Sequence, residues 1–145
     1  MNPSWSIEDE LLVKNAAMAN LIHTCYRITD IDRSVSFYEA LGFEEVGRFP
    51  IRDEAINVFM NIPGDGDMPR LELTYNHGVD SYEIGTGYGH IAVSVDDLAA
   101  TLERLQEQGI EPEREPYRVR EGGSLICFVR DPDDYRIELI ERSAK

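Results

Sequence analysis

Apolar and polar side chains alternate along several short segments of the chain, and two longer segments have the period of a helix. Residues 21–29 alternate as a half-buried strand does. Residues 30–41 instead place Val35 and Tyr38 on one face of a helix. Gly42 then follows, a typical residue just after a last helical turn. Three strand-like segments complete this half of the chain: residues 44–49, 55–62 and 70–75.

The second half of the chain repeats this order of elements. Residues 90–95 alternate like a strand, and residues 96–108 have the helical period, with Leu98 and Leu102 on the inner face. Gly109 then ends this helix. Strand-like segments follow at residues 113–117, 124–129 and 136–141.

The two halves carry the same residue types at equivalent positions. An offset of 67 residues carries His23 onto His90, and an offset of 66 carries Glu72 onto Glu138. Each half therefore reads strand–helix–strand–strand–strand, with a histidine in its first strand and a glutamate in its last. We predict an α+β fold of two tandem βαβββ modules that form similar curved sheets. Because each half alone has little core, the halves need one another or a second copy of the chain.

The predicted domain is preceded by a segment with two possible interpretations. Ser6 and Asp9 fit a helix-capping pattern, and an apolar stripe would then follow at Leu11, Leu12, Ala16 and Ala19. The alternative is a frayed tail. The predicted divisions are an N-terminal extension over residues 1–20, a domain over 21–141 with modules at about 21–76 and 88–141, and a tail over 142–145.

The composition limits the partners that the chain can have. It contains 28 acidic and 14 basic residues, a net charge of −14, which argues against binding to nucleic acid or to an anionic membrane. No apolar segment approaches the ~18 residues of a membrane span, and the N-terminus lacks the features of a secretory signal, so we expect a cytoplasmic protein. Cys25 and Cys127 are too few and too distant for a disulfide framework, and we expect both to be small buried side chains.

Strand alternation places the histidines and glutamates on polar faces. In the first half, His23 shares a face with Cys25 and Arg27, and the face of Glu72 also carries Asn76. A single mid-strand glutamate would most simply lie on a solvated outer face. Two glutamates and two histidines at repeat-equivalent positions instead favour one common site. Two imidazoles and two carboxylates suit a divalent metal such as Ni, Zn, Co or Mn, with positions left open for substrate.

Three segments of the chain resemble the glyoxalase I (lactoylglutathione lyase) family of the vicinal oxygen chelate superfamily. They are LIHTCYRITDIDRSVSFYEALGF (21–43), LELTYNHGVDSYEIGTGYGHIAVSVDD (71–97) and DPDDYRIELIE (131–141). The resemblance implies a homodimer with a metal site in each of two interface cavities. It places the four metal ligands at His23 and Glu72 of one subunit and His90 and Glu138 of the other. The short stretch between the two halves resembles the nickel-preferring bacterial branch, so we expect Ni or Co first and Zn second.

The resemblance also implies where substrate binds. The glutathione-contacting arginine and asparagine of the family correspond to Arg27 and Asn76, and a basic residue in a later loop corresponds to Arg120. The family's usual DPDGY reads DPDDY here, so Asp134 stands where the family has glycine. Aspartate adopts a positive φ less readily than glycine, so this substitution bears on the conformation of the turn.

The implied reaction is the isomerisation of the methylglyoxal–glutathione hemithioacetal to S-lactoylglutathione through an enediolate. Glu138 is expected to remove the C1 proton, and Glu72 to serve the opposite diastereomer. The alternatives are another metalloenzyme of this superfamily, such as an epimerase or a lyase that uses a different thiol, and a non-catalytic dimer that binds a drug or metabolite. Glu72 argues against the epimerase, which has glutamine there, and the complete His-Glu-His-Glu set argues against a binding protein.

Overall fold

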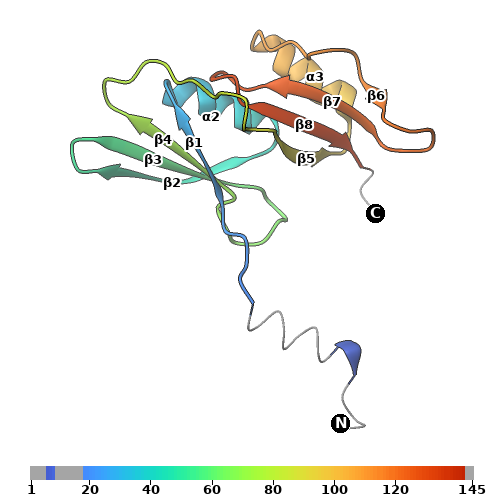
Figure 1. The fold of residues 1–145 in the computed structure, drawn as a ribbon, viewed down its shortest axis with the longest axis horizontal. Coiled ribbons are helices and arrows are strands. Elements are labelled where there is room, and N and C mark those ends of the chain that lie inside the picture. Colours follow the sequence, from blue (N-terminus) through green and yellow to red (C-terminus); the bar gives the residue numbers. More distant parts are fainter. Residues whose placement is uncertain (1–5, 9–17, 143–145) are drawn as a thin grey trace.

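Two four-stranded sheets, each with one helix, make up the computed structural model of this chain, which describes residues 6–8 and 18–142 (Figure 1). Most of the predicted capping pattern and apolar stripe in the N-terminal extension falls on residues 9–17 and so lies outside the described residues. In the described part of the chain, no helix has the length and apolar character needed to cross a bilayer.

The first sheet is built from the first half of the chain. Its strands have the spatial order β1-β4-β3-β2, in which β1 runs parallel to β4 and the other neighbours are antiparallel. The elements are β1 (Thr24–Ile28), α2 (Ile31–Ala40), β2 (Glu44–Ile51), β3 (Ala55–Asn61) and β4 (Leu71–Asn76).

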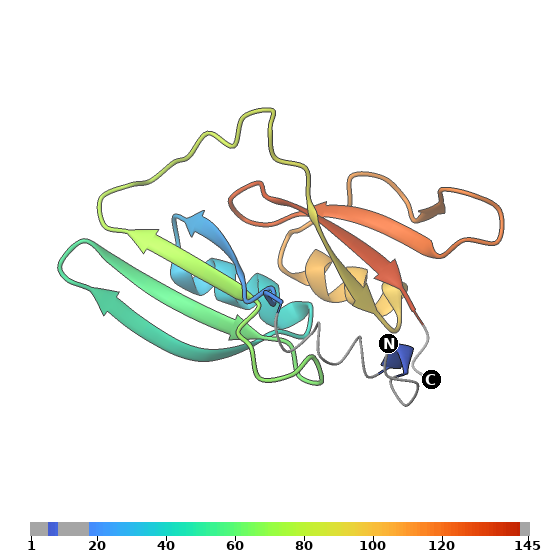
Figure 2. The same cartoon turned by 60° about the horizontal axis from the view of Figure 1, so that its bottom comes forward.

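The second sheet repeats this topology with the second half of the chain. Its order is β5-β8-β7-β6, and β5 runs parallel to β8. The linker between β4 and β5 carries the chain from one sheet to the other (Figure 2). The elements are β5 (Ile91–Val95), α3 (Leu98–Glu107), β6 (Tyr117–Arg118), β7 (Leu125–Arg130) and β8 (Arg136–Glu141). The prediction of an α+β fold with two tandem βαβββ modules is confirmed.

Both helices lie within the segments that the sequence predicts, and each is one or two residues shorter at either end. The Asp30 side chain caps α2 by accepting a hydrogen bond from the Arg33 N–H, and Asp97 caps α3 in the same way. Gly42 and Gly109 follow the helix ends with φ of 103° and 80°, where a β-carbon would add strain.

One buried apolar cluster joins the two modules. Side chains from both helices and both sheets contribute to it, so each sheet buries one face and leaves the other available. Its largest fully buried members are Tyr38, Phe37, Ile28, Met60, Leu71, Leu73, Leu98, Leu105, Ile137 and Leu139.

Two expectations from the sequence are wrong in detail. The strand expected at residues 113–117 is reduced to the two residues of β6, because Pro112 and Pro116 have no N–H to donate to a ladder. The expectation of buried cysteines holds for Cys127 but not for Cys25, which is exposed. Cys25 alternates with the buried Tyr26, so it lies on the face of the first sheet that no described element covers.

Candidate functional site

His23 and Glu72 form a pair on the available face of the first sheet. His23 directly precedes β1, and Glu72 lies on the parallel neighbour β4, opposite Cys25. The His23 Nε2 atom is 2.8 Å from a Glu72 carboxylate oxygen, and the side chains are 32% and 17% exposed. The ring of Phe59 packs edge-on against the imidazole, with ring centres 5.9 Å apart.

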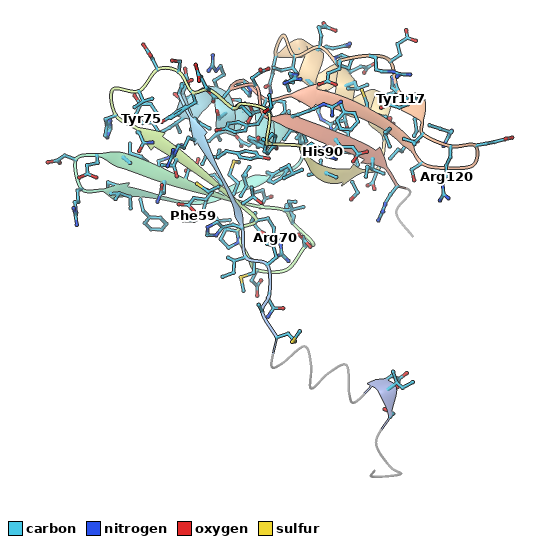
Figure 3. All side chains as sticks on the ribbon, viewed as in Figure 1. Phe59, Arg70, Tyr75, His90, Tyr117 and Arg120 are labelled. Carbon is cyan, nitrogen blue, oxygen red and sulfur yellow. The ribbon has the colours of Figure 1, made fainter. Side chains whose placement is uncertain are left out.

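The second sheet repeats this arrangement at His90 and Glu138. Figure 3 labels His90, which directly precedes β5, and its Nε2 atom is 3.3 Å from a Glu138 carboxylate oxygen on β8. The side chains are 37% and 17% exposed, nearly as in the first pair. Phe128 packs edge-on against the imidazole, with ring centres 5.1 Å apart.

The two phenylalanines were not predicted from the sequence. Phe59 lies opposite Glu72 in the β3–β4 register, and Phe128 lies opposite Glu138 in the β7–β8 register. The duplication therefore extends to an aromatic partner for each His–Glu pair. The repeat does carry a sequence signal for them, since the two phenylalanines are 69 residues apart. This signal is easily missed because the histidines align at an offset of 67 and the glutamates at 66.

Each sheet thus supplies one imidazole and one carboxylate, and the two pairs stay apart within one chain. Among residues 6–8 and 18–142, no three histidine, cysteine, aspartate or glutamate side chains are grouped closely enough to hold a metal ion. A typical catalytic zinc site has at least three protein ligands, so one imidazole and one carboxylate are too few. The donor types fit a divalent metal, and a complete set requires two such pairs to meet.

Two further polar side chains lie on the face of the first pair. Arg27 is exposed on β1, two positions from Cys25, and its backbone N–H and C=O both hydrogen-bond to the Tyr135 hydroxyl group. Asn76 ends β4, and its amide donates a hydrogen bond of 2.9 Å to the Tyr82 hydroxyl group in the linker. The structure therefore brings Arg27 and Asn76 to the same sheet face as His23.

Arg120 lies apart from the other candidates. It is exposed in the turn between β6 and β7, and Figure 3 shows it at the far end of this hairpin, away from His90. The Arg118 side chain binds the Gly123 carbonyl oxygen and closes the hairpin, so the turn presents Arg120 outward. Within one chain, Arg120 is not part of either His–Glu pair.

Charged side chains surround the second pair. The Arg136 guanidinium group stacks on the Phe128 ring at 3.7 Å and binds the Glu113 carboxylate at 2.9 Å, while Arg130 binds the same carboxylate at 3.1 Å. The hydrogen bonds from Arg136 lower the pKa of Glu113. Glu113 therefore stays ionised and holds both guanidinium groups in place beside the strand that carries Glu138.

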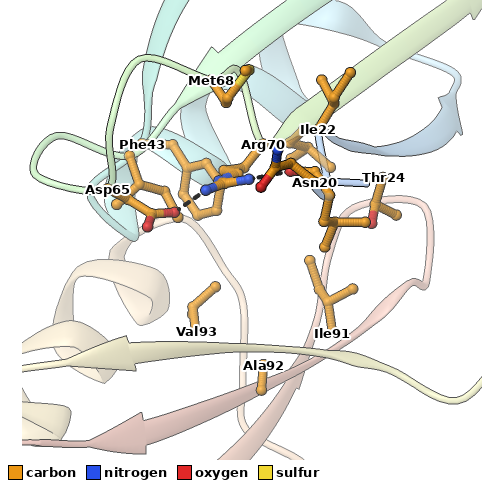
Figure 4. Close-up of a pocket in the computed structure, with 13 residues that line it drawn as sticks. Asn20, Ile22, Thr24, Phe43, Asp65, Met68, Arg70, Ile91, Ala92 and Val93 are labelled. Atoms are coloured by element: carbon orange, nitrogen blue, oxygen red, sulfur yellow. Dashed lines mark hydrogen bonds and ion pairs between the residues drawn. The ribbon is translucent and has the colours of Figure 1, made fainter. Parts of the chain in front are cut away.

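A separate cavity of about 660 Å³ lies between the modules, lined by the start of β1, by β5 and by the loop before β4 (Figure 4). Its lining is mostly apolar and includes Ile22, Phe43, Met68 and Ile91. The one basic side chain in its wall, Arg70, is paired with Asp65 at 3.1 Å. None of the four candidate metal ligands lines this cavity, so the chemistry predicted from the sequence belongs elsewhere.

Comparison with known proteins identifies relatives over nearly the whole domain. The family model for the Glyoxalase/Bleomycin resistance protein/Dioxygenase superfamily matches residues 20–139. A probable chloroplastic lactoylglutathione lyase of Arabidopsis thaliana is 41% identical over 139 residues, 93% of this chain and 39% of that protein. The lactoylglutathione lyase of Haemophilus influenzae is 40% identical over 126 residues, 86% of this chain and 93% of that protein. The chain thus spans less than half of the plant relative and nearly all of the bacterial one.

Solved structures agree with these matches. Glyoxalase I from Zea mays superimposes with a TM-score of 0.78 at 38% identity, over 87% of this chain and 46% of that chain. The trypanothione-dependent glyoxalase I of Leishmania major superimposes with a TM-score of 0.73 at 35% identity, over 86% and 87%. The expected cytoplasmic location stays a prediction, since the name of the Arabidopsis relative places that protein in the chloroplast.

Proposed function

The chain belongs to the Glyoxalase/Bleomycin resistance protein/Dioxygenase superfamily, and we propose that it is a metal-dependent lactoylglutathione lyase. In this proposal it converts the hemithioacetal of methylglyoxal and glutathione into S-lactoylglutathione. The observation that carries the proposal is the pair of equivalent His–Glu half-sites, in a chain about 40% identical to lactoylglutathione lyases over most of its length. A binding protein of the same superfamily has no need of such a duplicated donor set.

We further propose that the protein works as a homodimer, in which each cavity combines half-sites from two subunits. His23 and Glu72 of one subunit would hold the metal together with His90 and Glu138 of the other. The separation of the two pairs within one chain supports this arrangement. Nickel or cobalt is the first choice and zinc the second, since nitrogen and carboxylate donors accept all three. When bound, the metal would supply electrostatic stabilisation of the negative charge that develops on the two substrate oxygens.

The proposed roles of the protein side chains are those that the family resemblance implies. Glu138 removes the C1 proton of the substrate and returns it at C2, and Glu72 does the same from the opposite face for the other diastereomer. Arg27 and Asn76 hold the glutamyl end of glutathione on the face of the first sheet. Arg120, at an exposed hairpin turn, would bind the glycyl carboxylate only in a cavity that a second subunit completes.

An activity assay on the purified, metal-free protein tests the reaction. Nickel, cobalt or zinc is added with methylglyoxal and glutathione, and thioester formation is followed by ultraviolet absorbance. We expect activity only with metal, and a loss of at least about a hundredfold in kcat for Glu138→Gln. A parallel reaction with trypanothione in place of glutathione identifies the thiol. Absence of activity with every metal and both thiols would refute the lyase and favour the metabolite-binding alternative.

Mixing two inactive variants tests the shared cavities. Glu72→Ala and Glu138→Ala are unfolded together and refolded as mixed dimers. If each cavity uses half-sites from two subunits, a mixed dimer has one intact cavity and one with both defects. Random pairing then restores about a quarter of the wild-type activity. Either variant refolded alone is the control, and a mixture as inactive as the controls would show that both pairs come from the same chain.

A further inference from the structure

The outer edge of β1 is closed by side chains from the other module. Among the strands that the structure describes, β1 is paired only with β4. Successive residues of a strand point their backbone N–H and C=O groups to alternate sides of the strand. The Thr24 N–H donates a hydrogen bond to the Arg70 carbonyl oxygen, on the β4 side of β1. Arg27 and Thr29 therefore turn their backbone groups to the open edge, which is where the β7–β8 turn lies against β1.

Two side chains of this turn make the contacts that a neighbouring strand would make. The Arg27 N–H donates to the Tyr135 hydroxyl oxygen at 3.2 Å, and the Tyr135 O–H donates to the Arg27 carbonyl oxygen at 2.9 Å. The Thr29 N–H donates to the Asp133 carboxylate at 3.2 Å. A single hydroxyl group thus satisfies both backbone groups of Arg27, across 108 residues of sequence.

The Tyr135 ring is itself held firmly. It stacks on Tyr26 with ring centres 4.1 Å apart and an angle of 7°, and it packs edge-on against Tyr88. Its backbone N–H donates to the buried Asp131 carboxylate at 2.9 Å. These contacts leave the hydroxyl group little freedom, so it holds the backbone of Arg27 in one place.

We propose that Tyr135 is a positioning residue for the substrate-binding Arg27. Its hydroxyl group fixes the end of the edge strand β1, and thereby the origin of the Arg27 side chain on the sheet face that carries His23 and Glu72. This inference rests on the proposed function, in which Arg27 holds the glutamyl end of glutathione. A pinned backbone lowers the ordering cost that Arg27 incurs when it binds its anionic partner.

Tyr135→Phe removes only the hydroxyl group and keeps the stacked ring. We expect KM for the hemithioacetal to rise about three- to tenfold, the factor associated with one lost hydrogen bond, while kcat changes less than about twofold. The affinity for S-methylglutathione, measured by calorimetry on metal-loaded protein, should fall by the same factor. The matched control is Tyr38→Phe, whose hydroxyl group binds Asp131 in the same turn but does not touch Arg27. The Tyr38→Phe variant should have a lower free energy of unfolding and an unchanged KM.

A double-mutant cycle separates positioning from general loosening of the fold. In an Arg27→Ala background, adding Tyr135→Phe should leave kcat/KM within about twofold, because the side chain that it positions is gone. The inference would be overturned if Tyr135→Phe lowered kcat/KM in the Arg27→Ala background as much as it does in the wild type. A wild-type KM in Tyr135→Phe alone would also overturn it. An equal rise of KM in Tyr38→Phe would also overturn it. Wild-type protein without activity would instead refute the proposed function, so the two failures are distinguishable.

Discussion

Asp131 should make the stability of this protein depend on pH in the direction opposite to most carboxylates. This residue is only 4% exposed. Its carboxylate accepts a hydrogen bond of 2.6 Å from the Tyr38 hydroxyl group and bonds of 2.9 Å from the backbone N–H groups of Asp133 and Tyr135. Burial raises the pKa of Asp131 from 3.8 to about 6, although these hydrogen bonds act to lower it.

The sign follows from which state holds the proton. Between pH 3.8 and about 6, the unfolded chain has released the Asp131 proton while the folded chain still holds it. The folded state is therefore favoured at low pH, and this contribution is lost as pH rises toward 6. The shift corresponds to about 3 kcal/mol in all, of which roughly half falls between pH 5 and pH 7.5.

Asp131→Asn keeps the shape of the side chain and cannot titrate. Urea unfolding of the wild type and of this variant is compared at pH 5 and at pH 7.5, with metal-free protein at one concentration. Other titrating groups, including the neighbouring Asp133, are present in both proteins and cancel in the difference. We expect the free energy of unfolding of the wild type to gain between about 1 and 2 kcal/mol on that of the variant at the lower pH. Two profiles that run parallel, or that diverge in the opposite sense, would refute the reasoning.

Three further predictions concern the turns and the half-sites. Asp134 has a φ of 78°, so Asp134→Gly should raise the free energy of unfolding by about 1 kcal/mol. Asp134→Ala, which keeps the β-carbon, should not, and urea unfolding compares the two. Phe128→Leu should weaken metal binding about three- to tenfold by freeing the His90 ring, as measured against a competing chelator; unchanged affinity would mean that the ring contact does not orient the ligand. Thr29→Val should cost about 1 to 2 kcal/mol of unfolding free energy, because the Asp133 carboxylate loses a hydroxyl donor at 2.5 Å.

Local patterning accounts for most of what the sequence predicts correctly. Alternation and helical period depend on neighbouring residues, and they place the strands and the two helices within a few residues, with a glycine after each helix. They also place His23 and Glu72 on one face, because the side of a strand that a residue occupies depends only on its position. The duplication then extends the argument to His90 and Glu138 without any knowledge of distances.

The features that the sequence misses depend on contacts between distant segments. The partner of Glu72 in the ladder, Phe59, follows from the register of β3 with β4, which the length of the intervening loop determines. The Tyr135 contact with Arg27 depends on how the two modules lie against each other. Cys25 illustrates the same limit, because its exposure depends on what covers its sheet face rather than on its apolar neighbours.

The packing between the modules bears on the proposal that the half-sites of two subunits combine. The buried cluster and the closed edge of β1 join the two modules of one chain firmly. Neither His–Glu pair lies in that contact, since both occupy sheet faces that the helices leave uncovered. Bringing the two pairs of one chain together would require breaking this inter-module core, and so would expose buried apolar surface. A second copy can present its own second-module pair to the first-module pair without such a rearrangement, and the same contact creates two equivalent sites at once.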